Sequence, residues 1–198
     1  MKKGIIWLSS YPKCGNTYVR IFLSHYIYLV KDEPDFSLLN KIPKFEHKET
    51  FAKVFPNIDL NTNFVYYKHC IDVQQKLISK FDQKDLIYKT HHFFGKINGY
   101  EFTNEQNTLM FIYLIRDPRE VAVSYASHSG ISIEEQIEMF IGKDKINRVG
   151  YETKINWMLS YKSWKSFNSV PSIFIKYEDL INDPVKFFSS IIYLLSRY

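Results

Sequence analysis

The chain has few of the residues and segments that define several common protein classes. Only two cysteines are present, Cys14 and Cys70, and their spacing fits neither a zinc ribbon nor a disulfide framework. The apolar segment Ile5–Leu8 is too short for a signal peptide, and the segment 21–30 falls short of a membrane span because serine and histidine interrupt it. No repeat or low-complexity linker is present. These absences predict a cytoplasmic protein that forms a single domain over residues 1–198.

Positive charge exceeds negative charge without forming a basic run. The chain carries 26 Lys and Arg against 21 Asp and Glu, which gives a formal net charge of +5. Lysines are scattered from Lys2 to Lys186, so a basic tail is not indicated and we expect no nucleic-acid partner. Two interpretations stay open: an ordinary basic surface, or a few cations that converge on a small polyanionic ligand.

Short apolar segments alternate with amphipathic segments along the chain. The apolar segments predict strands at 4–9, 86–89, 109–115 and 172–177. Apolar residues spaced three and four apart predict helices at 16–30, 72–81, 118–127, 133–141, 155–167 and 184–195. The mixed segment 31–63 predicts loops and short helices. This alternation predicts an α/β fold with a parallel central sheet flanked by helices.

Helix starts are marked by capping residues at several places. Asp117 and Asp183 each precede a proline, as expected of an N-cap followed by the first helical residue. Ser132 with Glu135 three residues later fits a capping box, and Gly130 predicts the end of the preceding helix. Ligands bind parallel α/β folds at the carboxyl ends of the strands, which directs attention to residues 10–18, 90–92 and 116–124.

The first of these segments lies between a predicted strand and a predicted helix. Such a turn aims backbone N–H groups and the positive end of the helix dipole at one point, where Gly15 permits close backbone approach. Lys13 adds a positive charge and Thr17 a hydroxyl donor, so the residues suit a phosphate group. Because Lys13 precedes Gly15, the spacing is not that of a Walker A motif. An ordinary strand-to-helix turn remains the alternative.

The other two segments also carry polar groups suited to anions or proton transfer. Arg116 follows a buried strand and can offer two parallel hydrogen bonds to a phosphate, and Ser124 adds a hydroxyl about two turns into the next helix. A surface ion pair of Arg116 with Asp117 or Glu120 is the alternative. The adjacent His91 and His92 suggest a metal site as another alternative. No Cys, Asp or Glu stands at metal-binding spacing from them, so no metal is expected.

Four motifs together resemble the PAPS-dependent sulfotransferases, and the segment SGISIE at 129–134 resembles the bacterial branch of that family. The loop YPKCGNTY at 11–18 resembles the family's YPKSGTTW or YPKSGNTW loop, which makes the N-terminal strand, loop and helix a P-loop-like phosphosulfate site. The segment RDPREVAVS at 116–124 is similar to the second family motif, and Lys89-Thr90-His91 matches its K-T-H element. The segment KYEDL at 176–180 matches a fourth element, so the resemblance runs from residue 4 to about 196.

The resemblance implies a reaction and roles for particular residues. The chain would transfer a sulfuryl group from 3′-phosphoadenosine-5′-phosphosulfate (PAPS) to a hydroxyl or amine, leaving 3′-phosphoadenosine 5′-phosphate (PAP). His91 would act as general base, while Lys13 and Lys89 would stabilise charge on the leaving phosphate oxygen. His92 is expected to be structural or to line the acceptor site. The implied donor-binding residues are Lys13, Cys14, Gly15, Asn16, Thr17 and Tyr18 at the phosphosulfate end, Arg116 and Ser124 at the 3′-phosphate, and Tyr177 near the adenine.

The sequence departs from the family pattern at three places. Cys14 replaces the usual serine; beside Lys13 and a helix N-terminus its thiol is expected to have a lowered pKa and to be oxidation-sensitive, or else to be a tolerated small residue. Tyr18 replaces the usual tryptophan and keeps a smaller aromatic platform. No R-K-G loop follows the last predicted helix, so the C-terminal part of the family domain is expected to be absent; each lost charge-assisted hydrogen bond would weaken donor binding by roughly 1.5–3 kcal/mol.

Several functional questions stay open at this point. The sulfotransferase has two alternatives: a non-catalytic nucleotide-binding or interaction module of the same fold, and a P-loop kinase-like phosphoryl transferase. Small-molecule, glycan, lipid and peptide acceptors are all compatible with the chain, and nothing indicates an oligomeric state. Residues 31–70 are expected to help form the acceptor side, where five aromatic residues either line an apolar pocket or belong to the core: Phe45, Phe51, Phe55, Tyr66 and Tyr67.

Overall fold

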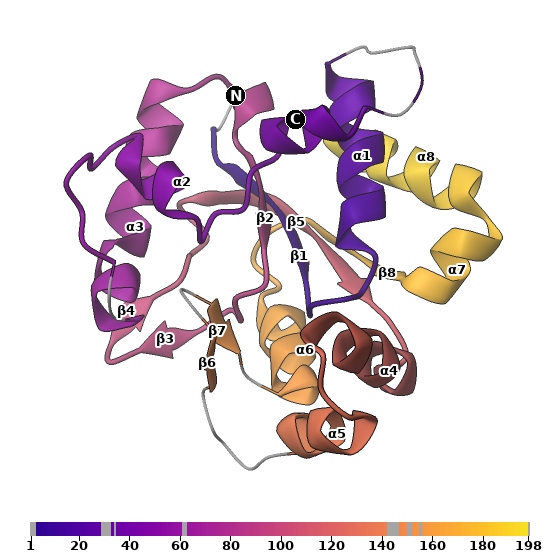
Figure 1. The fold of residues 1–198 in the computed structure, drawn as a ribbon. Helices are drawn as coiled ribbons and strands as arrows, with labels where there is room; N and C mark the ends of the chain where they lie inside the picture. The colour runs from indigo at the N-terminus through magenta and orange to yellow at the C-terminus, as the bar shows by residue number, and fades with distance from the viewer. Residues whose placement is uncertain are drawn as a thin grey trace.

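A four-stranded parallel sheet, in the order β2-β1-β5-β8, forms the centre of the computed structural model (Figure 1). The structure describes residues 3–28, 33, 35–60, 63–141, 147–149, 152–154 and 156–197. The strands are β1 (Ile5–Ser10), β2 (Ile87–Thr90), β5 (Thr108–Ile115) and β8 (Ser172–Lys176). Parallel strands joined through helices confirm the predicted α/β class.

The two inner strands are the most continuously apolar. Every residue of β1 is buried, and β5 is buried from Thr108 to Leu114. Trp7 pairs with Tyr88 of β2 on one side and with Phe111 of β5 on the other. Strands covered on both faces need apolar side chains at successive positions, which explains why these segments lack polar alternation.

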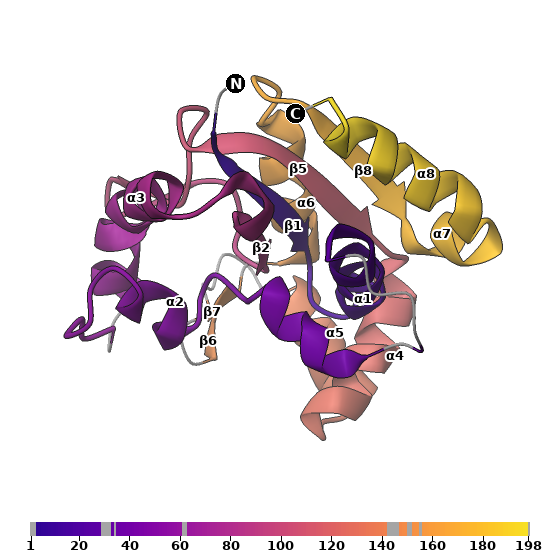
Figure 2. The same cartoon turned by 90° about the horizontal axis from the view of Figure 1, so that it is seen from above.

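Helices cover both faces of the sheet, as the view from above makes clear (Figure 2). One core cluster joins the sheet to α3 (Asn63–Lys80) and α6 (Trp157–Ser166). The other joins it to α1, α4, α7 and α8, which span Asn16–Ile27, Pro118–Ser129, Tyr177–Asn182 and Pro184–Leu195. α5 (Ile133–Ile141) packs beside α4.

The remaining elements are short. Two 3₁₀ helices are present, η1 (Phe36–Lys41) and η2 (Gln83–Asp85), together with the short helix α2 (Lys48–Ala52). Two antiparallel hairpins pair β3 (Lys96–Ile97) with β4 (Tyr100–Glu101), and β6 (Asn147–Val149) with β7 (Glu152–Lys154). The hairpins were not predicted, because strands of two or three residues are too short for an apolar pattern to mark them.

The predicted capping residues start and end the helices as expected. The Ser132 N–H donates to Glu135 Oε2 at 2.9 Å and the Glu135 N–H donates to Ser132 Oγ at 3.1 Å, which completes the capping box. The Asp183 side chain accepts the Lys186 N–H at 3.1 Å. Gly130 ends α4 with φ 68°, in the left-handed region that glycine tolerates.

The helix predicted at 72–81 begins earlier, and that boundary was wrong. α3 starts at Asn63, since Tyr66, Tyr67 and Cys70 continue inward the face formed by Val73 and Leu77. Two other predicted boundaries, residues 29–30 after α1 and Ile155 before α6, lie outside the described residues.

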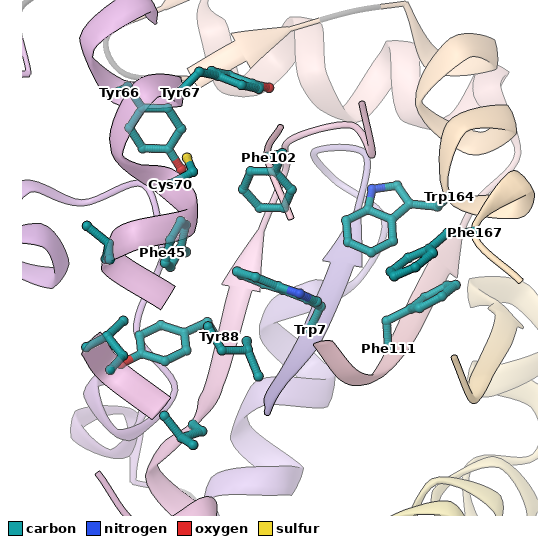
Figure 3. Packing of buried hydrophobic residues seen from close by; sticks show 14 of the residues in the cluster. Trp7, Phe45, Tyr66, Tyr67, Cys70, Tyr88, Phe102, Phe111, Trp164 and Phe167 are labelled. Atoms are coloured by element: carbon teal, nitrogen blue, oxygen red, sulfur yellow. The ribbon is translucent and has the colours of Figure 1, made fainter. Parts of the chain in front are cut away.

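Aromatic side chains fill the core between the sheet and α3 (Figure 3). The Trp7 ring lies 5.0 Å from the rings of both Phe45 and Phe102, centroid to centroid, and Phe111 stacks on Phe167 at 5.7 Å. Four of the five aromatic residues considered for an acceptor pocket are buried here, and Phe55 packs against the same cluster. They therefore belong to the core. No helix in the described part of the chain is long and apolar enough to cross a membrane.

Candidate active site

The carboxyl ends of the four strands bring the sequence motifs to one edge of the sheet. Ser9 pairs with Thr90, and Ser10 pairs with Leu114. At the next junction Ile115 pairs with Lys176, the last residue before α7. The loops that leave β1, β2, β5 and β8 consequently start side by side. Segments separated by up to about a hundred and sixty residues in the sequence thus form one site, because parallel strands end together.

The loop between β1 and α1 adopts two left-handed backbone conformations. Lys13 has φ 67°, and Gly15, the residue that precedes α1, has φ 86°. No side chain caps α1, so its first backbone N–H groups are not taken up by a capping residue. Such N–H groups and the helix dipole favour an anion at this position.

Asn16 closes the loop against the strand. Its Nδ2 donates to the Leu8 carbonyl and to Ser10 Oγ, both at 3.2 Å. The side chain is buried, and among the described residues its Oδ1 finds no hydrogen-bond partner. Asn16 therefore shapes the loop with its side chain, whereas Thr17 and Tyr18 are exposed.

Arg116, Tyr177 and Gly15 form a second cluster at the same edge. The Arg116 guanidinium lies 4.7 Å from the centroid of the Tyr177 ring, and its Nη1 donates to the Lys13 carbonyl at 3.2 Å. The Tyr177 ring lies so close to Gly15 that a Cβ there would come within 2.3 Å of it. The structure thus joins the phosphate-type loop to Arg116 and to the start of α7.

The ion-pair alternative for Arg116 is realised in part. Its Nη2 lies 3.5 Å from Glu120 Oε2, one helical turn along, and the Glu120 side chain is exposed. Asp117 pairs with Arg119 instead, and its backbone N–H donates to Glu178 Oε1 at 2.9 Å. Because an exposed carboxylate binds arginine only weakly, this pair leaves Arg116 able to bind another anion.

Ser124 and Tyr18 lie farther from this cluster. Ser124 is half-buried in α4, and no hydrogen bond within the described residues joins it to Arg116. The Tyr18 ring is 39% exposed and meets the edge of Phe188 at 5.3 Å. Their roles toward a nucleotide stay predictions.

His91 is held in one tautomer. Its Nδ1 lies 2.8 Å from the Ser10 carbonyl, and a carbonyl only accepts, so Nδ1 carries the proton and Nε2 has a free lone pair. Burial, together with the charge of Lys89, keeps the pKa of His91 well below its usual value. The imidazole is therefore neutral at pH 7, as a general base requires.

Lys89 occupies a partly buried, strongly basic environment. Burial lowers the pKa of its ammonium group to about 8, although the nearby charge of Glu46 acts in the opposite direction. Lys44 and Arg20 lower it further by repulsion. Lys89 thus loses its charge within the range of pH in which enzymes are assayed.

His92 turns into the core, as the alternation along an extended segment predicts. Its Nδ1 lies 3.1 Å from the Tyr67 hydroxyl, and its carbonyl accepts from Trp164 Nε1 at 2.8 Å. Its role is structural. In the described ranges, no group of three or more His, Cys, Asp or Glu side chains is arranged to hold a metal ion.

Of the two alternatives for Cys14, burial favours a tolerated small residue over a reactive thiol. Its side chain is 0% exposed, and burial raises the pKa to about 12, an effect that Arg116 only partly offsets. The Sγ atom points to the Pro12 carbonyl at 3.8 Å, away from solvent. A lysine one residue earlier does not lower the pKa of a thiol that is removed from water.

Sequence reasoning missed Glu46. Its carboxylate lies under the loop after β2, with Oε1 accepting from the Thr90 hydroxyl and from the His91 N–H, the latter at 2.8 Å. A single glutamate after Phe45 in a mixed segment has no pattern that distinguishes it from a surface residue. Only the pairing of Lys44 with Lys89 brings it beside the motif.

Comparisons with known proteins agree with this fold. A family model described as sulfotransferase domain matches residues 3–195. No curated protein matches the chain. Retinol dehydratase in a complex with androsterone and inactive cofactor PAP is 19% identical with a TM-score of 0.57, and the match covers 96% of this chain and 59% of that one. The complex of retinol dehydratase with retinol and PAP is also 19% identical with a TM-score of 0.57, over 98% and 60% of the two chains.

A third solved structure is similar in the same way. A mouse sulfotransferase complexed with PAP is 17% identical with a TM-score of 0.53, and the match covers 99% of this chain and 59% of that one. The chain thus spans about three fifths of the length of these structures. At such low identity the likeness extends to the fold alone.

Proposed function

The chain belongs to the sulfotransferase family, and from this premise we propose that it transfers a sulfuryl group from PAPS to a hydroxyl or amine acceptor, leaving PAP. The observation that carries the proposal is the convergence of the Lys13 loop, Arg116 and His91 at one edge of the sheet. The three groups supply an anion site, an arginine for a second phosphate and a neutral base. PAP in three structures of similar fold supports the choice of donor.

The residues have complementary roles in this reaction. The first N–H groups of α1 and Lys13 would hold the phosphosulfate, while Arg116 and Ser124 would bind the 3′-phosphate and Tyr177 would lie near the adenine. His91 Nε2 would accept the proton of the acceptor as its oxygen or nitrogen bonds to sulfur. Lys13 and Lys89 would stabilise the electron pair that stays on the phosphate oxygen when the sulfur–oxygen bond breaks.

The acceptor is proposed at the level of a small molecule that bears a hydroxyl group. Retinol and androsterone in two of the similar structures support this class. We propose in addition that residues 1–198 form a single domain, because the two core clusters share the strands β1, β2 and β5.

The donor is tested by calorimetric titration of the chain with PAP beside ATP, without added metal. We expect selective PAP binding that is lost in Arg116→Ala and Lys13→Ala. Arg119→Ala is the matched control, because Arg119 is an exposed neighbour that pairs with Asp117 and should leave binding unchanged. Stronger binding of ATP, dependent on Mg²⁺, would instead support a phosphoryl transferase.

Turnover is tested with PAPS labelled in its sulfuryl group against a panel of phenols, sterols, sugars and lipids. We expect transfer to at least one hydroxyl acceptor and its loss in His91→Asn, with PAP affinity retained. PAP binding without transfer to any acceptor would support a non-catalytic nucleotide-binding module.

A further inference from the structure

Glu46 is a buried carboxylate tied to the loop that carries His91. Glu46 is 1% exposed, and its Oε1 accepts hydrogen bonds from the Thr90 hydroxyl and the His91 N–H. Thr90 Oγ1 in turn accepts the His92 N–H at 3.0 Å. One carboxylate oxygen therefore holds the Thr90 side chain and the His91 backbone, and through Thr90 Oγ1 it also supports the His92 backbone.

The segment before α2 holds Glu46 in this position. The Phe45 N–H donates to the Lys89 carbonyl at 2.9 Å, and the Lys89 N–H donates to the Pro43 carbonyl at 3.0 Å. These two bonds extend the sheet by one isolated bridge beyond β2. This backbone pairing places the Glu46 side chain beside Thr90.

His91 is fixed from two directions as a result. Its backbone is held by Glu46, and its ring is held by the Ser10 carbonyl at 2.8 Å. Two independent anchors, one from the segment before α2 and one from β1, leave the imidazole little freedom to rotate. A base that must meet an acceptor proton benefits from such pre-orientation.

Charged and titratable groups surround Glu46 on every side. The loop after β2 contributes His91 and His92, whose Nε2 lies 4.0 Å from Glu46 Oε1. β2 contributes Lys89, the segment of Glu46 itself contributes Lys44, and α3 contributes Tyr66 and Cys70. The charge of Arg20 in α1 also acts on Lys89. The carboxylate is the one carboxylic acid in this set, and its cationic neighbours are Lys44 and Lys89.

Burial by itself favours the neutral form of Glu46, but electrostatic interactions with the His92, Lys44 and His91 side chains and the Thr90 hydrogen bond lower its pKa to about 2. The group is ionised at neutral pH. A glutamine would supply the same acceptor oxygen without the cost of a buried charge, and unlike a glutamine the carboxylate opposes the effect of burial on the pKa of Lys89. Among the cationic neighbours of Glu46, Lys89 has a pKa close to neutral pH, at about 8.

We propose that Glu46 is a positioning residue of the sulfuryl-transfer site, whose carboxylate orients His91 through its backbone and keeps Lys89 protonated through its charge. The inference rests on the proposed function, in which His91 and Lys89 take part. It assigns Glu46 two separable effects, one geometric and one electrostatic.

The electrostatic effect is tested with Glu46→Gln in the chain without any ligand. The titration of Lys89 is followed by NMR of its ε-methylene group and assigned with Lys89→Arg. We expect the midpoint to move from about 8 to lower pH, because the charge that opposes burial is gone. Thr90→Val is the matched control: it removes one hydrogen bond to the carboxylate, keeps the charge, and should leave the midpoint unchanged.

The catalytic consequence is read from the pH profile of kcat in the PAPS assay. If the Lys89 midpoint falls by about one unit, the protonated fraction at pH 8 falls from about a half to about a tenth, so kcat there should drop roughly fivefold. At pH 6.5 the loss should be much smaller. A merely structural defect would lower kcat equally at both pH values.

The geometric effect is tested with Glu46→Asp, which keeps the charge but is too short to reach the His91 N–H. We expect kcat to fall at all pH values while the Lys89 midpoint stays in place and KM for PAPS is unchanged. This variant also keeps the test open if Glu46→Gln does not fold.

The outcomes separate this inference from the proposed function. An unchanged Lys89 midpoint in Glu46→Gln, or full kcat in Glu46→Asp, would overturn the role of Glu46. A wild-type chain that transfers no sulfuryl group would overturn the proposed function, and the Lys89 titration would then decide alone whether Glu46 sets the charge of this lysine.

Discussion

The ring of Tyr177 lies directly against Gly15, where a Cβ would stand 2.3 Å from Cδ2 and 2.6 Å from Cε2 of the ring. Gly15 also has φ 86°, a backbone conformation that side chains disfavour. The Arg116 guanidinium lies over the same ring. The loop after β1, the end of β5 and the start of α7 are thus locked together through one tyrosine.

This contact predicts a strong effect of Gly15→Ala. The variant adds the strain of a left-handed alanine, about 1–2 kcal/mol, and in addition displaces the Tyr177 ring. We expect PAP binding to be lost in calorimetry while circular dichroism shows a folded chain. Gly99→Ala is the matched control, because Gly99 has φ 83° and nothing within 4 Å of its added Cβ. Equal PAP affinity in the two variants would contradict the role of the Tyr177 contact.

Burial predicts that Cys14 is unreactive in the folded protein. With a pKa of about 12 and no exposed surface, the thiol should not react with a disulfide reagent at pH 8. A Cys70→Ala chain isolates Cys14, and denaturant should restore reaction with one thiol per chain. Rapid reaction of the native protein, protected by PAP, would show instead that the loop opens and that the thiol is accessible.

Because Phe45 lies in the core, we expect its truncation to lower the stability of the fold and not to change the choice of acceptor. Phe45 is 0% exposed and contacts Trp7, so Phe45→Ala should lower the free energy of unfolding by about 3–5 kcal/mol in urea titrations. Phe36→Ala is the control, because Phe36 is 65% exposed and should change stability by less than about 0.5 kcal/mol. If Phe45→Ala raised the KM for the acceptor and left stability unchanged, Phe45 would have to be assigned to the acceptor site.

Glu46 predicts a loss of stability in acid. Its pKa is about 2 in the folded chain against the ordinary value of 4.5, so the folded state favours the ionised group. The stabilisation is fully present above pH 4.5 and is lost as the pH falls from 4.5 towards 2, with a total of roughly 3 kcal/mol.

The measurement is the urea unfolding free energy at pH 6 and at pH 3 for the wild type and Glu46→Gln. The difference between the two chains should shrink at pH 3. Glu138→Gln, at an exposed site on α5, serves as the control and should follow the wild type at both pH values. A pH-independent difference for Glu46→Gln would show that its carboxylate is not selectively ionised in the fold.

The local sequence determined the strands, most helix ends and the candidate loop positions. An apolar segment such as 109–115 is stable between two covered faces of a sheet, and a proline after Asp117 or Asp183 is tolerated in the first turn of a helix but not in its interior. Capping depends on residues a few positions apart, which is why Ser132 and Glu135 paired as predicted. The carboxyl-end rule for parallel sheets then predicts that residues 10–18, 90–92 and 116–124 lie at one edge of the sheet.

The tertiary structure decided everything that depends on which distant groups share a buried space. The charge state of Cys14 follows from its removal from water, which a neighbouring Lys13 in the sequence does not reveal. Tyr66 and Tyr67 proved to be core residues because α3 lies against the sheet. Glu46 acquired its partners through the isolated bridge between Lys44 and Lys89. Hydrogen bonding and desolvation act through space, so a residue's chemistry is set by neighbours that the sequence places far away.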